Sequence, residues 1–404
     1  MGNKIVVQTI FYLSVFLVIM FPAASITQAF IFASLGDAQL QSTNLKNTAV
    51  QINGLNPDFA IFNGDLGDNG YSKSELDTMT SALNCGGSCS LFNKTFLVRG
   101  NHDTKDTSTI VDASSWQSYF AAINRPLPPG ISNYIGLSTS STYLNYSFDY
   151  GNSRFIGLDT NDWGDLPNAT QLSFLDSRLT NAESLGLTHA FIYFHAPAYC
   201  VESTHCSCST KNDSSCTPSA LITIINKHPI VSATFHGHEH ILGWTHMDNT
   251  RVAGLTHPYE QFITSPSGGW TYNSYLYGGT STPTRMEYAY PLSSSAQGFG
   301  TITVDGLSFT MNIYKVGQTA PVWTKTFTKP GAPSSSPSPT PSPTPSPSAK
   351  PGDANGDGKT DGIDYFIWLN HYNQAFTGPT YGDFNKNSIV DGVDYVIWLN
   401  NYGK

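Results

Sequence analysis

The sequence predicts an α/β protein with a small α-helical module at its carboxyl end. Short apolar, β-branched segments alternate with amphipathic segments over residues 30–329, a pattern typical of a sheet covered by helices. Residues 330–350 consist largely of Pro, Ser and Thr and favour an extended polyproline conformation, so we expect them to form a linker. Residues 351–404 contain one sequence unit twice, which marks a second domain.

Strands of the large domain are predicted where the sequence is apolar and rich in β-branched or aromatic residues. In chain order they are residues 30–35, 59–63, 95–99, 153–158, 189–194 and 230–235. The amphipathic segments between them predict helices at residues 43–53, 73–83, 113–123, 170–185 and 219–226. Residues 265–329 are rich in Gly, Tyr and Thr and are predicted to contain strands only, the last two at 300–304 and 308–314.

The composition excludes several classes of protein. The chain of 404 residues is 39% apolar and 13% aromatic, which supports a sizeable core and excludes disorder throughout. Charged residues make up only 12%, about half of the ~25% that is usual for a soluble domain. The net charge is −9 and there is no basic run, so nothing indicates sequence-specific binding of nucleic acid.

Residues 1–29 have the features of an export signal. Lys4 supplies the amino-terminal charge, residues 5–20 are an apolar run, and small residues follow. Because the run is shorter than the ~20 residues that span a bilayer comfortably, a cleaved signal is favoured over an uncleaved anchor, with cleavage near Ala24 or Ser25. The protein is therefore predicted to be secreted or held at the cell surface.

The six cysteines fall into two groups, and export permits disulfides between them. Cys85 and Cys89 are close in sequence, and the second group comprises Cys200, Cys206, Cys208 and Cys216. A zinc site is the rival interpretation of the second group. Disulfides are favoured there because the group contains no Cys-x-x-Cys pair, although their connectivity stays open.

Polar residues follow five of the predicted strands directly. The patterns are Gly-Asp, Gly-Asp-x-x-Asp and Gly-Asn-His-Asp after the first three strands, then a single His after the fifth and Gly-His-x-His after the sixth. In open α/β sheets the carboxyl ends of the strands form the edge where ligands bind. The candidate residues at that edge are Asp37, Asp65, Asn101, His102, Asp103, His195, His238 and His240.

Each of these patterns alone is weak. Gly-Asp pairs usually mark turns, and a lone His after a strand is more often a satisfied polar group than a ligand. Their joint occurrence, in order and each at a strand end, favours a functional site over turns alone. Oxygen and imidazole donors without thiolate suit divalent transition metals such as Fe, Mn or Zn.

With these motifs, residues 30–318 resemble the calcineurin-like metallophosphoesterases, the superfamily that includes the purple acid phosphatases. The resemblance extends to the segment at residues 146–160. It implies a sandwich of two sheets with helices outside, and a centre of two divalent metals. The motifs are specific for the superfamily but say little about the substrate.

The resemblance also implies a role for each residue. Asp37, Asp65 and His240 would hold the first metal, and Asp65, Asn101, His195 and His238 the second. A metal-bound hydroxide would attack phosphorus in line with the leaving oxygen. His102 would protonate the leaving group, and Asp103 would orient its ring.

Two positions depart from the family pattern. Many members carry Asp-x-His in the first motif, whereas this chain has Gln39, whose amide oxygen is a weaker ligand. Gln39 could bind the first metal, contact it through water, or leave that site weak. Asp68 stands where purple acid phosphatases place a metal-bound Tyr, so the protein is not expected to be purple.

The tail repeats have the spacing of calcium-binding loops. Oxygen donors stand at positions 1, 3, 5, 9 and 12 of a twelve-residue loop, and a backbone carbonyl serves position 7, as in EF-hands. The second loop has one carboxylate fewer and is expected to bind calcium more weakly. The predicted ligands are Asp353, Asn355, Asp357, Lys359, Asp361 and Asp364 in the first loop, and Asp383, Asn385, Asn387, Ile389, Asp391 and Asp394 in the second.

The tail resembles a type I dockerin, a module with two calcium loops that docks onto a cohesin domain. Gly362-Ile363 and Gly392-Val393 stand where cellulosomal dockerins commonly have Ser-Thr, a departure that leaves cohesin specificity open. The partner implied by the resemblance is a cohesin-like or cell-surface scaffold protein. The recurring aromatic residues of the two helices are expected to form the core of this small module, namely Tyr365, Trp368, Tyr395 and Trp398.

These observations predict a secreted phosphoesterase that depends on two metals, hydrolyses phosphate monoesters or diesters, and is tethered through a calcium-dependent docking module. The alternative is a non-catalytic surface or scaffold-binding protein on the same fold, with Gln39 marking lost activity. The complete set of other ligands, together with His102, weighs against this alternative.

Overall fold

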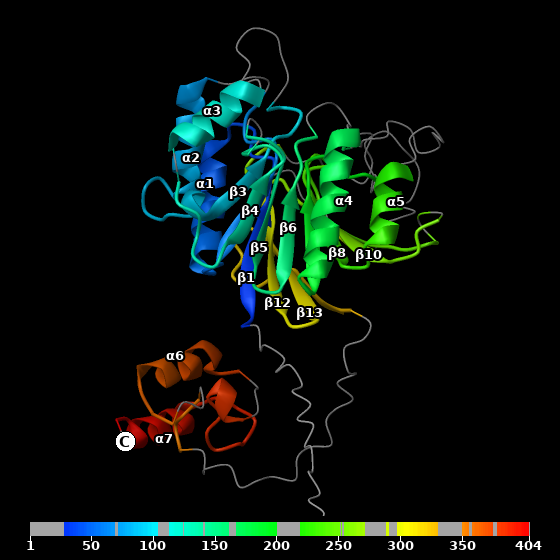
Figure 1. The fold of residues 1–404 in the computed structure, drawn as a ribbon. Coiled ribbons are helices and arrows are strands. Elements are labelled where there is room, and N and C mark those ends of the chain that lie inside the picture. Colours follow the sequence, from blue (N-terminus) through cyan, green and yellow to red (C-terminus); the bar gives the residue numbers. More distant parts are fainter. Residues whose placement is uncertain are drawn as a thin grey trace, which may run out of the picture. The chain divides into compact units, whose positions relative to one another are not determined.

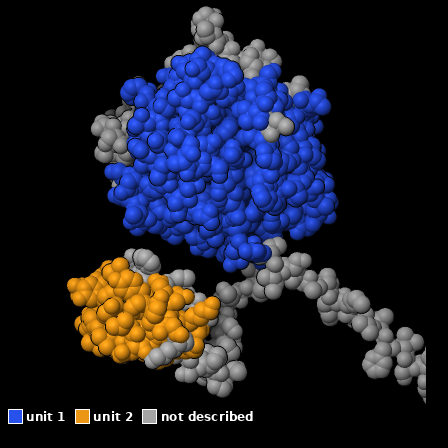
Figure 2. Space-filling model, turned by 90° about the vertical axis from the view of Figure 1, so that its left-hand side faces the viewer, with its two compact units in different colours: residues 1–330 blue, residues 331–404 orange. Residues whose placement is uncertain are grey.

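The computed structural model divides the chain into two compact units, residues 1–330 and 331–404 (Figure 2). It describes residues 28–68, 72–103, 113–123, 125–139, 142–160, 167–199, 219–250, 252, 254–270, 288–290, 297–329, 350–354, 358–374 and 378–403. The predicted export signal and the second cysteine group lie outside these residues, apart from positions 28 and 29. Within the described part, no helix is both long and apolar enough to cross a membrane.

The first unit contains two mixed sheets. The six-stranded sheet has the order β14-β13-β12-β1-β2-β3, in which β1, β2 and β3 are parallel and the others antiparallel. Its strands are β1 (Phe30–Leu35), β2 (Phe59–Asn63), β3 (Thr95–Val98), β12 (Gly298–Asp305), β13 (Ser308–Lys315) and β14 (Trp323–Thr328).

The eight-stranded sheet has the order β11-β9-β10-β8-β7-β6-β5-β4. Its central strands β6, β7, β8 and β10 are parallel, and antiparallel strands flank them on both sides. The strands are β4 (Ser132–Gly136), β5 (Tyr146–Tyr150), β6 (Ser153–Gly157), β7 (His189–Tyr193), β8 (Val231–His236), β9 (Leu242–Met247), β10 (Tyr259–Thr264) and β11 (Tyr288–Tyr290).

An aromatic core joins the inner faces of the two sheets. Phe32 of β1 lies with its ring centroid 5.0 Å from that of Phe155 and 5.6 Å from that of Phe235, both in the other sheet. Phe59 of β2 likewise lies 4.9 Å from Phe155. Edge-to-face contacts of this kind add to the free energy of burial. The sheets therefore pack as a sandwich, as the resemblance implied.

Helices cover the outer faces of the sandwich (Figure 1). α1 (Ser42–Gly54), α2 (Lys73–Leu83) and α3 (Ala113–Ile123) pack on the six-stranded sheet, and α4 (Ala169–Ser184) and α5 (Ser219–Lys227) pack on the other. A capping box at Ser72 and Glu75 begins α2, and a second at Asn168 and Gln171 begins α4. Both sheets are thus buried on both faces over their parallel strands, which explains the unbroken apolar runs there.

The predicted strands and helices occur at the predicted places, within two residues at each end. Four strands, β4, β5, β9 and β10, were not predicted. β11 and β14 lie within residues 265–329, where only strands were expected, but neither was predicted individually, and β14 follows the strand expected to be the last. β4 is mostly exposed and carries no apolar run, and β10 mixes Glu260 and Gln261 with apolar residues. Cys85 and Cys89, the pair close in sequence, form a disulfide.

The second unit is built from the repeated sequence. Its helices are α6 (Gly362–His371) and α7 (Gly392–Asn401), with the short helix η3 (Pro379–Tyr381) between them. The Trp368 indole donates to the Asp391 carbonyl and the Trp398 indole to the Asp361 carbonyl, both at 2.9 Å. Each repeat therefore holds the loop of the other, and the predicted packing of the two tryptophans is confirmed.

A buried histidine of β7 predicts how the stability of the first unit depends on pH. Burial lowers the pKa of His189 to about 4 from 6.5, so the unfolded chain takes up the proton first as the pH falls. The free energy of unfolding therefore keeps its full value above pH 6.5 as far as His189 is concerned. It falls by about 3 kcal/mol as the pH decreases from 6.5 to 4. Denaturant unfolding between pH 7 and 4 should show this loss, and the His189→Gln variant should lack that part of it.

Candidate metal centre

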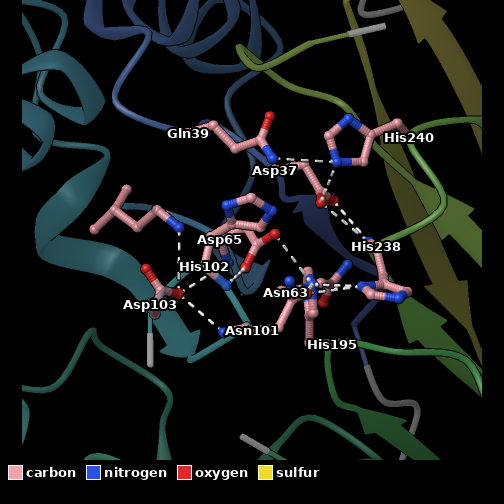
Figure 3. Close-up of polar contacts among 12 residues, drawn as sticks. Asp37, Gln39, Asn63, Asp65, Asn101, His102, Asp103, His195, His238 and His240 are labelled. Atoms are coloured by element: carbon pink, nitrogen blue, oxygen red, sulfur yellow. Dashed lines mark hydrogen bonds and ion pairs between the residues drawn. The ribbon is translucent and has the colours of Figure 1, made fainter. Parts of the chain in front are cut away.

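The five polar segments meet where the carboxyl ends of strands from both sheets converge (Figure 3). Asp37 follows β1, Asp65 follows β2 and Asn101 follows β3 in one sheet. His195 follows β7 and His238 follows β8 in the other. All five side chains are buried. The site therefore requires both sheets, and neither sheet alone could form it.

Four of the candidate metal-binding residues have left-handed backbone conformations. Asp37, Asp65, His238 and His240 have φ values of 53°, 57°, 68° and 51°, which non-glycine residues seldom adopt. Backbone hydrogen bonds hold these loops, since Asp37 N–H donates to the Gly64 carbonyl and Gly237 N–H donates to the His195 carbonyl. Strain of this kind persists where the surrounding structure over-determines it, and it concentrates at functional sites.

The first group of donors comprises Asp37, Asp65 and His240. One ligand atom of each lies within 4.8 Å of the others, and all three side chains are buried. His240 Nε2 lies 3.1 Å from Asp37 Oδ1, and the other ring nitrogen donates to the Trp270 carbonyl. That outer hydrogen bond fixes which ring nitrogen faces the group, as is usual for a metal-binding histidine.

The second group comprises Asp65, Asn101, His195 and His238. Asn101 Oδ1 lies 3.0 Å from His195 Nε2 and 2.8 Å from His238 Nδ1. The two imidazole nitrogens are 3.2 Å apart, and His195 Nε2 is 3.2 Å from Asp65 Oδ2. His195 Nδ1 donates to the Asn63 carbonyl at 2.8 Å, which leaves Nε2 facing the group.

This donor set fits two cations. Two ligands at right angles on an ion, with bonds of about 2.1 Å, lie about 3.0 Å apart, and the donor atoms of the second group have that spacing. Asp65 belongs to both groups, as a bridging carboxylate must. The oxygen and imidazole composition suits Zn, Mn or Fe.

Electrostatics within the site favours charge separation. Burial alone would raise the pKa of Asp37, but attraction to His240 and their hydrogen bond outweigh burial and hold this pKa well below its usual range. Burial alone would lower the pKa of His195, but Asp65 raises it to about 9. The carboxylates thus attract positive charge into the site, and a cation would compete with these protons.

Gln39 lies beside the first group, but its amide oxygen already accepts a hydrogen bond. The amide oxygen accepts from Trp270 N–H at 3.2 Å, and the amide nitrogen lies 3.5 Å from His240 Nε2. Turning the amide to present its oxygen to a metal would set its NH₂ group against the Trp270 N–H. Of the three roles left open by the sequence, direct ligation is therefore disfavoured in this arrangement.

The structure corrects the role expected for Asp103. Its carboxylate is fully buried and accepts four backbone N–H groups, from Asp65, Leu66, Gly67 and Gly100. Burial, with the nearby Asp65, raises its pKa to about 6. Asp103 therefore ties together the loops after β2 and β3 and does not orient a ring.

Asp68 contacts His102 in the place expected for Asp103. Asp68 Oδ1 lies 2.7 Å from His102 Nδ1, and both side chains are partly exposed. His102 N–H also donates to Asp65 Oδ1 at 2.8 Å, which fixes the backbone beside the metal ligands. In the sequence, Asp68 drew attention only because purple acid phosphatases have a metal-bound Tyr at this position. The signal that was available is its place as the second Asp of Gly-Asp-x-x-Asp.

A glycine beside Asp37 gives a test of the first group. A Cβ atom on Gly237 would lie 2.3 Å from Asp37 Oδ2 and 3.1 Å from the Asn63 carbonyl oxygen. Gly237→Ala should therefore displace Asp37 and weaken metal binding at least ~10-fold by titration calorimetry, because a displaced carboxylate no longer faces the cation. Gly54→Ala is the control, since nothing lies within 4 Å of its added Cβ. Equal affinities in both variants would contradict the assignment.

The predicted calcium loops are placed only in part. In the second loop, the Asp383 and Asp394 carboxylates are fully buried, and Asp394 accepts the N–H groups of Asn385 and Asp391. Asn387 also accepts a backbone N–H, and the Ile389 side chain is exposed. In the first loop Asp364 repeats the Asp394 pattern, with N–H groups from Ala354 and Asp361. Asn355 and Asp357 lie outside the described residues, whereas Asp353 is buried and Lys359 exposed.

One family model matches this chain. Its description is calcineurin-like phosphoesterase, and it matches residues 32–242, more than half of the 404 residues. The match includes every residue of both donor groups, together with Asp68, His102 and Asp103. No curated protein matches the sequence.

Several solved structures are similar to the first unit in fold. A purple acid phosphatase isolated from yellow lupin (Lupinus luteus) seeds has a TM-score of 0.56 at 14% identity, over 75% of this chain and 54% of that one. The chain thus spans about half the length of the lupin protein. PhoD has a TM-score of 0.46 at 11% identity, over 74% and 68% of the two chains. GAP50, the anchor in the inner membrane complex of Plasmodium, has a TM-score of 0.44 at 14% identity, over 74% and 89%.

Proposed function

The chain belongs to the calcineurin-like phosphoesterase family, and from that membership we propose that it hydrolyses phosphate esters with two divalent transition metals. The observation that carries the proposal is the position of Asp65. Its carboxylate lies within 4.8 Å of Asp37 and His240 donor atoms and 3.2 Å from His195 Nε2. One carboxylate shared between two donor groups is what a pair of cations ~3.5–4 Å apart requires.

The proposed ligands fall into two sets, one for each cation. Asp37, Asp65 and His240 would hold one cation, and Asp65, Asn101, His195 and His238 the other. The cations, Zn, Mn or Fe by donor chemistry, would neutralise the phosphoryl oxygens and make water acidic enough to supply a nucleophile. The His195 and His240 rings donate to the backbone carbonyls of Asn63 and Trp270, which holds these two imidazoles in place, so little reorganisation accompanies the reaction.

His102 is placed to deliver a proton to the leaving oxygen. Its ring is 22% exposed, so a substrate can reach it, unlike the buried ligands. Asp68 fixes the ring through Nδ1, and Nε2 makes no hydrogen bond within the described residues. A general acid must have a free ring nitrogen within hydrogen-bond reach of the leaving group. His102 with Asp68 meets that requirement, and Asp103 supports the loop beneath them.

Metal analysis combined with turnover tests the proposal on the full chain. The protein is assayed with 4-nitrophenyl phosphate and with bis(4-nitrophenyl) phosphate, after loading with Mn²⁺, Zn²⁺ or Fe²⁺. About two metals per chain with turnover supports the proposal, and the preferred ester distinguishes a monoesterase from a diesterase. Stoichiometric metal without turnover under any cation supports the alternative, a binding protein that keeps the fold.

We further propose that the protein is exported and that its second unit is a calcium-dependent docking module. Asp383 and Asp394 are fully buried carboxylates, and within the described part of the chain neither forms an ion pair. A bound cation would offset the cost of burying them. Val393, Val396 and Leu399 of α7 are about half exposed, which gives this small module an apolar face for a scaffold protein of the cohesin kind.

Calcium removal tests the second unit within the full chain. Chelation with EGTA should unfold residues 350–404 and expose Trp368 and Trp398, which a red shift of tryptophan emission and faster proteolysis would report. The first unit should keep its circular dichroism signal from the sandwich. Asp383→Asn should raise the calcium concentration at the midpoint about 10-fold or more, whereas Val396→Ala, half exposed on α7 and outside the loops, should not. Identical fluorescence with and without calcium would contradict the proposal.

A further inference from the structure

A cavity lies in the first unit away from the metal centre. It has a volume of about 230 Å³ and lies among η1 (Phe92–Lys94), β3, α3, β4 and the start of β5. It adjoins the amino-terminal half of β3, at Thr95 to Leu97, whereas Asn101 and His102 follow the other end of that strand. None of the proposed metal ligands lines it.

The cavity wall carries a guanidinium without a carboxylate partner. Arg125 Nη1 donates to the Phe92 and Thr95 carbonyls, and the guanidinium carbon lies 4.2 Å from the Phe92 ring centroid. Its Nε and Nη2 groups form no hydrogen bond, and no carboxylate pairs with it, among the residues that the structure describes. Burial lowers the pKa of Arg125, as expected for a cation whose charge is not balanced.

A tyrosine hydroxyl provides a second free donor at the cavity. The hydroxyls of two neighbouring tyrosines already form hydrogen bonds, since Tyr134 donates to the Thr142 carbonyl and Tyr146 donates to the Leu97 carbonyl. The Tyr143 hydroxyl has no such partner in the described part of the chain, and it is near enough to Arg125 to affect it electrostatically. The cavity therefore presents a cation and a free hydroxyl at its wall.

Much of the remaining wall is aromatic or aliphatic. Phe96, Trp116 and Phe120 line the cavity together with the rings of the tyrosines. Trp116 is fully buried, and its ring lies 4.7 Å from that of Phe120, so this wall is rigid. An apolar cavity of about 150 Å³ is known to hold one benzene molecule. The present volume therefore admits one ring with a charged substituent.

We propose that this cavity binds a small organic anion, a single aromatic ring that carries a carboxylate. The planar guanidinium fork of Arg125 matches a carboxylate, and the ring would pack between Phe96, Trp116 and Phe120. One cation balances one carboxylate, whereas a phosphate dianion would need a second. Lys94 also lines the cavity, but its ammonium group is held by the Pro57 carbonyl, so we assign the carboxylate to the Arg125 fork.

Ligand-observed fluorine NMR on the full chain tests the site with 4-fluorobenzoate as the probe. The wild type should broaden the probe signal at millimolar concentrations or below. Arg125→Gln should weaken binding at least ~10-fold, and Tyr143→Phe should weaken it several-fold. Benzyl alcohol and acetate, which each lack one half of the ligand, should bind at least ~10-fold more weakly in competition, and inorganic phosphate should not compete.

Matched variants distinguish binding in this cavity from binding at another cation or at the metal centre. Lys325 also lies over an aromatic ring, 3.7 Å from the centroid of Trp244, but it does not line the cavity, so Lys325→Gln should leave binding unchanged. Asp65→Asn should also leave binding of the probe unchanged, because Asp65 does not line the cavity. A probe bound at the metal centre would instead bind more weakly to this variant.

A second variant keeps the test decisive if Arg125→Gln fails to fold. Leu127→Trp, at the half-exposed rim, fills the cavity and should also prevent binding of the probe. The proposal is overturned if the wild type does not bind 4-fluorobenzoate, if Arg125→Gln and Leu127→Trp bind it normally, or if Asp65→Asn abolishes binding.

Discussion

The Asp65→Asn variant is expected to lose about one metal of the two per chain and to lose turnover at least ~10³-fold. The Asp65 carboxylate is the side chain that we assign to both donor groups. An amide cannot bridge two cations as a carboxylate does, and losing several kcal/mol of electrostatic stabilisation corresponds to that factor in rate. Elemental analysis and hydrolysis of 4-nitrophenyl phosphate measure the two effects on the same sample.

The substitution changes few other interactions. The Asn side chain has the same shape, and its oxygen can still accept the His102 N–H that Asp65 Oδ1 accepts. Circular dichroism should therefore match the wild type. Asp77→Asn, which replaces an exposed carboxylate on α2, should retain both metals and full turnover. Two tightly bound metals with undiminished turnover in Asp65→Asn would contradict the proposed centre.

The His102→Ala variant is expected to lose turnover by ~10²–10⁴-fold on an alkyl phosphate, whose leaving oxygen needs a proton. The loss should be much smaller on 4-nitrophenyl phosphate, whose leaving group departs without one. Metal content should stay at about two, since His102 belongs to neither donor group. Steady-state kinetics on the two esters checks this, and an equal loss on both would contradict a role in proton transfer.

Two carboxylates near His102 distinguish positioning from structural support. Asp68→Asn should reproduce the leaving-group dependence of His102→Ala in weaker form, because Asp68 contacts the ring at Nδ1. Asp103→Asn should instead lower the free energy of unfolding by about 1–3 kcal/mol, because an amide NH₂ would face a backbone N–H such as that of Gly67. Leaving-group dependence in Asp103→Asn at unchanged stability would restore the role first expected from the sequence.

Much of the architecture was predictable because the parallel strands of the two mixed sheets are short and buried. Such strands read as unbroken apolar runs, as at Phe59–Asn63 and His189–Tyr193, and helices with capping boxes separate them. β4 and β10 escaped prediction because exposure or polar residues interrupt the pattern there. Whether a strand is at an edge, and which face it buries, depends on neighbours that a local pattern does not contain.

Local sequence was enough to identify the family motifs, the chain order of the candidate ligands and the change in composition near the division into two units, because strand ends and linker composition are local properties. The contacts between these segments became clear only in three dimensions. Packing paired His102 with Asp68, buried Asp103 under four N–H groups and turned the Gln39 amide oxygen toward Trp270. It also left Arg125 beside a cavity with no carboxylate partner in the described residues. These contacts join side chains from strands and loops that are far apart in sequence, and their positions are set by how the two sheets pack.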